Sequence, residues 1–139
     1  MATTLEKFLL KIGRDLTGGV IRLTILAEIG RHGPIHGYAL IKALADNVGG
    51  PDIIRTGTLY PLLNELERDG LVRSTWAPGE AGPQRKEYEL TAMGRQALRL
   101  SIREWARIRD AIDVVTRHQA GPVRQEPAAS LRAKPGEST

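Results

Sequence analysis

The most informative part of the sequence is residues 56–90, TGTLYPLLNELERDGLVRSTWAPGEAGPQRKEYEL. Its first part, residues 56–69, predicts a helix, because leucines recur at helical spacing and form one apolar face. Gly70 directly after it is a typical helix stop. The leucines of this face are Leu59, Leu62, Leu63 and Leu66.

A β-hairpin is predicted directly after this helix. Residues 71–77 and 86–90 alternate in polarity and are rich in β-formers, and they flank the turn-prone residues 78–83. Three cations lie on these strands or beside the tip, where they could grip phosphates. They are Arg73, Arg85 and Lys86. The alternative is a solvated basic hairpin without a partner.

The elements on either side are helical by pattern. We expect an amino-terminal helix in residues 1–19, capped by Thr3 and Glu6 and ended by Gly18-Gly19, and further helices at 20–29 and 36–47. Thr91 is expected to cap a long helix that reaches residue 118. Three helices and a hairpin within residues 20–90 predict a winged helix-turn-helix, a mainly α fold with a β-hairpin wing.

This gives four segments. They are an amino-terminal helix (1–19), a winged helix-turn-helix DNA-binding domain (20–90), a long carboxy-terminal dimerisation helix (91–118) and a disordered tail (119–139) that is rich in proline and poor in bulky apolar residues.

The outward face of the helix 56–69 is small or polar, as a helix in the major groove requires. Glycine lets the backbone approach phosphates, hydroxyl groups suit phosphate oxygens, and the Asn64 carboxamide can pair with adenine. The alternative is an ordinary surface helix, which Glu65 and Glu67 favour because carboxylates repel phosphates. The predicted DNA-binding residues of this helix are Thr56, Gly57, Thr58, Tyr60, Asn64 and Arg68.

The long helix 91–118 carries an apolar stripe over about five turns. A winged domain of this size cannot cover such a stripe, so we expect a second copy to do so, giving a homodimer. Trp105 lies in the stripe and either packs in the interface or lines a cavity and stacks on a flat ligand. The stripe is formed by Leu98, Ile102, Trp105, Ile108, Ile112 and Val115.

Composition and the absence of known motifs reduce the number of possible function classes. The 139 residues carry a net charge of +4, which permits an anionic partner such as double-stranded DNA, and contain no cysteine. No nucleophile elbow, Walker loop or dinucleotide fingerprint occurs, and Gly33-Pro34 separates His32 from His36, so we expect no enzyme, metal or cofactor. With no apolar run of 18 residues and no export signal, we expect a cytoplasmic protein without a membrane partner.

The sequence also resembles a known family. Leu23–Ala27, Gly33–Tyr38, Gly57–Leu63, Asp69–Leu71 and Gly82–Tyr88 are similar in order and spacing to the PadR family of bacterial transcriptional regulators. The resemblance implies a homodimeric winged-helix repressor of the short branch, often relieved by a small aromatic or drug-like effector. It also implies DNA contacts by Thr56, Thr58, Tyr60, Arg85 and Lys86, and effector stacking on Trp105. The alternative is a small module that binds an aromatic ligand or a protein without regulating transcription.

Overall fold

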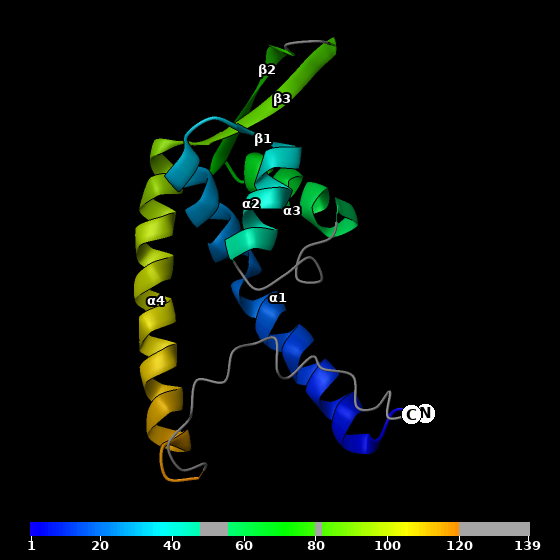
Figure 1. Ribbon diagram of the computed structural model, residues 1–139. Helices are drawn as coiled ribbons and strands as arrows, with labels where there is room; N and C mark the ends of the chain where they lie inside the picture. Colours follow the sequence, from blue (N-terminus) through cyan, green and yellow to red (C-terminus); the bar gives the residue numbers. More distant parts are fainter. Residues whose placement is uncertain (48–55, 80–81, 120–139) are drawn as a thin grey trace. The chain divides into compact units, whose positions relative to one another are not determined.

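The computed structural model describes residues 1–47, 56–79 and 82–119, which form helices and a small sheet (Figure 1). In chain order the elements are α1 (Thr4–His32), β1 (Ile35–His36), α2 (Gly37–Asn47), α3 (Thr56–Arg68), β2 (Val72–Gly79), β3 (Gly82–Leu90) and α4 (Ala92–Thr116). The predicted winged helix-turn-helix class is therefore confirmed. The chain forms two compact units, Met1–Arg103 and Glu104–Thr139. Residues 120–139, which hold nearly all of the predicted tail, lie outside the described part.

Helix α1 begins as predicted but does not end as predicted. The Thr3 hydroxyl accepts the Glu6 backbone N–H (3.2 Å), and the Glu6 carboxylate accepts the Thr3 N–H (2.7 Å), which completes a capping box. The break predicted at Gly18-Gly19 is wrong, because one helix runs through both glycines to His32. A helical glycine costs about 1 kcal/mol relative to alanine but keeps its backbone hydrogen bond. Gly33, with φ of 69°, ends the helix instead.

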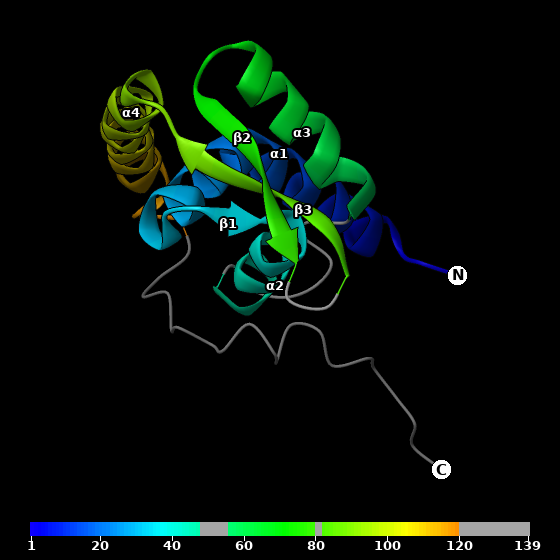
Figure 2. The same ribbon diagram turned by 90° about the horizontal axis from the view of Figure 1, so that it is seen from above.

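The sheet is antiparallel, with β3 between β1 and β2 (Figure 2). The hairpin is longer than predicted, since its strands reach Gly79 and Gly82. The third strand, β1, was not predicted because it has only two residues, and it pairs Ile35 with Tyr88 and His36 with Glu87. This pairing joins the start of α2 directly to the wing.

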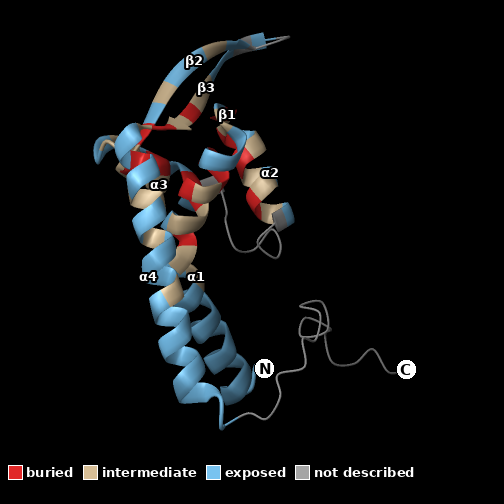
Figure 3. Ribbon diagram, turned by 90° about the vertical axis from the view of Figure 1, so that its left-hand side faces the viewer, coloured by how far each residue is buried: buried red, intermediate tan, exposed pale blue. Residues whose placement is uncertain are grey.

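The hydrophobic core lies among the second half of α1, α2, α3 and the sheet (Figure 3). The first sixteen residues, by contrast, are exposed all round. The fully buried side chains of the core include Ile25, Ile29, Leu40, Leu44, Leu59, Leu63, Val72 and Tyr88.

The junction between the wing and α4 is tightly built. The Thr91 hydroxyl accepts the Gly94 N–H (3.0 Å), as predicted for a helix cap, and donates to the Gly70 carbonyl (2.7 Å). A β-carbon at Gly94 would overlap the Leu71 carbonyl oxygen, so only glycine fits there. The base of the hairpin is thus held against the first turn of α4.

Candidate nucleic-acid interface

Helix α3 has the two faces that its sequence predicts. Leu59, Leu63 and Leu66 are buried in the core and Leu62 is half-buried. On the opposite side Thr58, Tyr60, Asn64 and Arg68 are exposed. These predicted DNA-contacting side chains are therefore accessible together on one face, while the side chain of Thr56 and the exposure of Gly57 lie outside the described part.

Both glutamates of α3 are paired within the protein. The Glu65 carboxylate accepts two hydrogen bonds from the Arg22 guanidinium on α1, 2.8 Å from Nε and 3.2 Å from Nη2. Glu67 accepts the Ser74 hydroxyl on β2 and lies 3.5 Å from the Lys86 ammonium on β3. The Arg22 hydrogen bond lowers the pKa of Glu65, which favours the charged, paired form. Pairing offsets the repulsion that unpartnered carboxylates would exert on phosphates.

The three cations of the hairpin differ in their surroundings. Arg73 pairs across the strands with Glu89 at 2.7 Å, so part of its charge is already neutralised. Lys86 lies between Glu67 and the Tyr88 ring, 5.7 Å above the ring centroid. Arg85 is exposed, and forms no ion pair within the described ranges. Arg85 is therefore the cation most available to an outside anion.

A hollow of about 360 Å³ lies where α2, α3 and β3 meet. It is lined by residues 36–38, Tyr60, Arg85, Lys86 and Tyr88, and we call it the notch. A β-carbon at Gly37 would stand 2.7 Å from the Tyr60 hydroxyl, so the glycine allows that hydroxyl to approach α2. Burial raises the pKa of Tyr88 at the notch, and Tyr60 and Glu67 raise it further.

Sequence reasoning missed Arg22, His36 and Tyr38 at this surface. Arg22 is separated from Glu65 by 43 residues, and no local pattern signals such a pair. The His36 Nδ1 accepts the Ala39 backbone N–H at 3.2 Å, which makes it the capping side chain of α2. His36 and Tyr38 do fall in the Gly33–Tyr38 motif, which was the available signal.

The stripe on α4 is exposed from Ile102 onward. Leu98 is half-buried and packs against the core of its own chain. Trp105, 41% exposed, belongs to the second compact unit together with Ile108, Ile112 and Val115, whereas Ile102 belongs to the first. The exposed members are Ile102, Trp105, Ile108, Ile112 and Val115.

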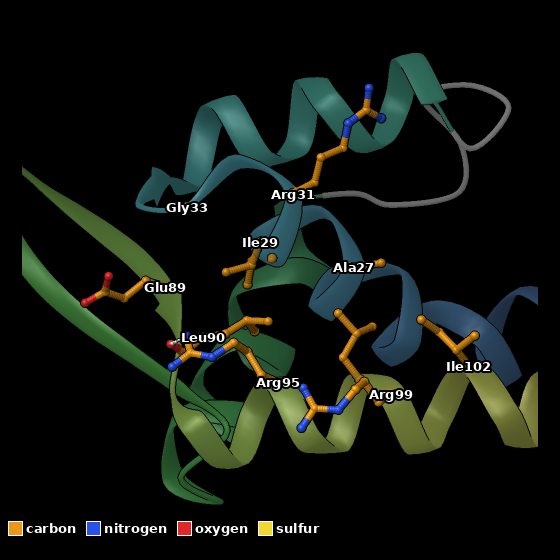
Figure 4. A pocket seen from close by; sticks show the side chains of 11 residues that line it. Ala27, Ile29, Arg31, Gly33, Glu89, Leu90, Arg95, Arg99 and Ile102 are labelled. Carbon is orange, nitrogen blue, oxygen red and sulfur yellow. Dashed lines mark hydrogen bonds between the residues drawn. The ribbon is translucent and has the colours of Figure 1, made fainter.

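A second pocket, of about 520 Å³, lies between the end of α1 and the first turns of α4 (Figure 4). Its walls combine apolar side chains such as Ile29 and Leu90 with the cations Arg95 and Arg99. The Arg95 guanidinium donates to the Leu90 carbonyl at 3.3 Å. None of the predicted DNA-binding residues lines this pocket.

The described residues form neither a metal centre nor a membrane span. No group of three or more His, Asp or Glu side chains there is placed to hold a metal ion. No helix in the same ranges is long and apolar enough to cross a membrane.

Known proteins share this architecture. The family described as "Transcriptional regulator PadR-like family" matches residues 25–100. A PadR family regulator from Eggerthella lenta is 32% identical, with a TM-score of 0.69 over 82% of this chain and 93% of that one. A Streptococcus transcriptional regulator is 30% identical (TM-score 0.64, 73% and 96% covered). A PadR-like regulator from Bacillus cereus is 27% identical (TM-score 0.63, 73% and 95% covered).

These similarities extend over the winged domain and into α4. The family match spans more than half of the chain and includes α2, α3, the hairpin and the start of α4. Members of this family are transcriptional regulators that bind DNA, not enzymes. The chain belongs to the PadR-like family of DNA-binding transcriptional regulators.

Proposed function

We propose that the protein is a homodimeric, sequence-specific repressor that inserts α3 into the major groove and lays the hairpin along the DNA backbone. The observation that carries this proposal is the exposed polar face of α3, whose two glutamates are both paired within the protein. Without that pairing, the carboxylates would oppose the approach of phosphates.

The DNA-contacting residues divide by chemistry. Asn64 reads a base edge, because a carboxamide can donate to and accept from adenine at once. Thr58, Tyr60 and Arg68 contact phosphates from α3, and Arg85 and Lys86 do so from the wing. Arg73 contributes less than Arg85, since it is held by Glu89. Thr56 and Gly57 belong to the same interface as the first residues of α3.

Dimerisation follows from the exposed stripe on α4. A row of isoleucines with a tryptophan is costly to leave in water, and a second copy offers the same row for packing. Two α3 helices related by a two-fold axis would then read two half-sites, about one helical turn or 34 Å apart.

Trp105 is the proposed contact for a regulatory ligand. Its ring is only partly exposed on a helix face assigned to the dimer interface, and a flat aromatic molecule could stack on it there. Such binding would relieve repression by favouring a dimer geometry in which the half-sites no longer match the spacing of the two α3 helices.

The experiment is a titration of the protein into labelled duplex from its own upstream region, with a shuffled duplex as control, at two salt concentrations. We expect selective binding that weakens on the order of 10³-fold between low and moderate salt, because six to ten phosphate contacts release counterions. Equal, weak binding of both duplexes would overturn the proposal.

The proposal that a regulatory ligand stacks on Trp105 is tested by tryptophan fluorescence in the Trp76→Phe variant, in which Trp105 is the remaining tryptophan. Planar aromatic compounds should quench Trp105 and release the duplex at matching concentrations. Quenching without release would contradict a regulatory role for the ligand.

A further inference from the structure

We propose that the notch is the seat of one DNA backbone phosphate, and that His36 and Tyr38 supply contacts there in addition to α3 and the wing. This inference rests on the proposed function, since it requires that this face of the protein docks on DNA. It adds a third element, the start of α2, to the interface.

The charges around the notch suit an anion. Its two charged lining side chains, Arg85 and Lys86, are both cations. The neighbouring carboxylate, Glu67, lies beyond the lining and is engaged by the Ser74 hydroxyl as well as by Lys86. An anion in the notch would therefore meet cations first, with Arg85 free of any ion pair to the described residues.

The His36 ring presents a hydrogen-bond donor. Its Nδ1 accepts the Ala39 backbone N–H, so in the neutral ring the proton is on Nε2. The ring is half-buried and lines the notch, and its Nε2–H is its remaining polar group. A phosphate oxygen, which only accepts hydrogen bonds, is the matching partner.

Beside the buried Tyr88, two more accessible tyrosines line the notch and supply hydroxyl donors. Tyr38 is 73% exposed at the start of α2, and Tyr60 reaches over Gly37 from α3. Hydroxyl, imidazole N–H, guanidinium and ammonium groups together form a lining that fits an oxygen-rich anion better than a base edge, whose donors need acceptors. Because Tyr60 also lies on the outward face of α3, the notch is continuous with the surface assigned to DNA, which identifies the anion as a DNA phosphate rather than a free ion.

The test uses two conservative variants of the full chain. His36→Asn keeps an acceptor that caps α2 but removes the Nε2–H, and Tyr38→Phe removes only a hydroxyl. Each should weaken binding to a duplex selected by the wild type from a random pool by roughly ten- to a hundredfold, the range for a hydrogen bond to a charged group. Lys11→Gln, on the exposed amino-terminal turns of α1, is the control and should bind nearly as the wild type does.

The phosphate itself is located with duplexes that carry a neutral methylphosphonate at one position at a time. At one position the substitution should weaken wild-type binding, while causing little further loss in His36→Asn or Tyr38→Phe. The notch assignment would be overturned if the losses from the methylphosphonate and from the side-chain substitution added fully at every position, or if the variants bound as the wild type does. Either result would leave the proposed function standing.

Two other outcomes are separable from that one. If the wild type selects no duplex at all, both the proposed function and the assignment of a phosphate to the notch are refuted. Saturable calorimetric binding of inorganic phosphate alone, abolished by Tyr38→Phe, would make the notch a free-anion site and overturn its assignment to DNA.

Discussion

The Arg22 guanidinium on α1 holds the Glu65 carboxylate on α3 through two hydrogen bonds that fix their relative orientation. The pair joins a core helix to the helix that we assign to the major groove. It also lowers the pKa of Glu65, so the carboxylate stays charged and its charge stays matched by Arg22.

We predict that Arg22→Ala weakens binding to the selected duplex roughly fivefold, or about 1 kcal/mol, because Glu65 is left as an unmatched anion on the DNA-facing helix. Fluorescence anisotropy measures this, with Arg14→Ala on the exposed part of α1 as the control for the lost charge. The double variant Arg22→Ala with Glu65→Ala should recover most of the affinity. A double variant as weak as Arg22→Ala would show that the charge of Glu65 is not the cause.

Stability should depend on pH through Tyr88. Burial raises the pKa of this hydroxyl, so the folded state keeps the proton to higher pH than the unfolded chain does. The resulting stability is fully present below the ordinary tyrosine pKa and is lost as the pH rises through that value toward the raised one. The free energy of unfolding in urea is measured for the wild type and Tyr88→Phe from neutral to alkaline pH. The wild type should lose stability at alkaline pH relative to the variant, which has no hydroxyl to titrate. A constant difference would contradict this.

Gly94→Ala should destabilise the protein by about 1–3 kcal/mol, because its β-carbon cannot share space with the Leu71 carbonyl oxygen. Gly13 offers a matched control on α1, where a β-carbon would meet nothing within 4 Å. Gly13→Ala should instead stabilise by about 0.5–1 kcal/mol, the helix-propensity difference. Urea midpoints that move in the same direction for both variants would contradict the packing argument.

Replacing Ile102 and Ile112 together by lysine should yield monomers that lose tight operator binding, because charges would then oppose each other across the proposed interface. Sedimentation equilibrium measures the oligomeric state. Leu100→Lys with Val114→Lys adds the same charge on the opposite side of α4 and should leave a dimer. A stripe variant that still sediments as a dimer would move the interface elsewhere, such as to the exposed apolar residues of α1.

Asn64→Ala should relax sequence preference, whereas Tyr60→Ala and Arg85→Ala should weaken binding to every duplex. The reason is that a base contact is worth about 1–3 kcal/mol only at its own base pair, while a phosphate contact is made on any sequence. Affinities for the selected duplex and its single-base variants separate the two classes. An equal loss on specific and shuffled DNA for Asn64→Ala would refute the base contact.

The elements predicted correctly are those with local signals. The helix α3, the wing, the capping box at Thr3 and the cap at Thr91 each depend on residues within a few positions of one another. The boundary at Gly18-Gly19 failed for the opposite reason. Two glycines weaken a helix locally, but whether it ends there depends on the conformation they adopt, and here they remain helical.

The candidate site was predicted only in part, because much of it depends on tertiary contacts. The outward residues of α3 follow from helical periodicity. The pairing of Glu65 with Arg22, and the meeting of His36 with Tyr60 and Arg85, join residues that are distant in sequence. In the sequence alone, Glu65 and Glu67 argued against a DNA-binding role for this helix, because their ion-pair partners Arg22 and Lys86 are evident only in the fold.

The unbroken helix α1 fixes the rotational position of its outer end relative to its buried end. The apolar residues at its outer end, from Leu5 to Leu16, and the buried ones from Ile21 to Ile29 lie on a single helical screw. Inserting one residue at Gly18 would turn the outer face by about 100° relative to the core, whereas inserting seven would turn it by only about 20°. The length of α1 therefore sets the direction in which its outer apolar face points relative to the core. A contact made by that face should be disturbed far less by an insertion of two helical turns than by an insertion of one residue.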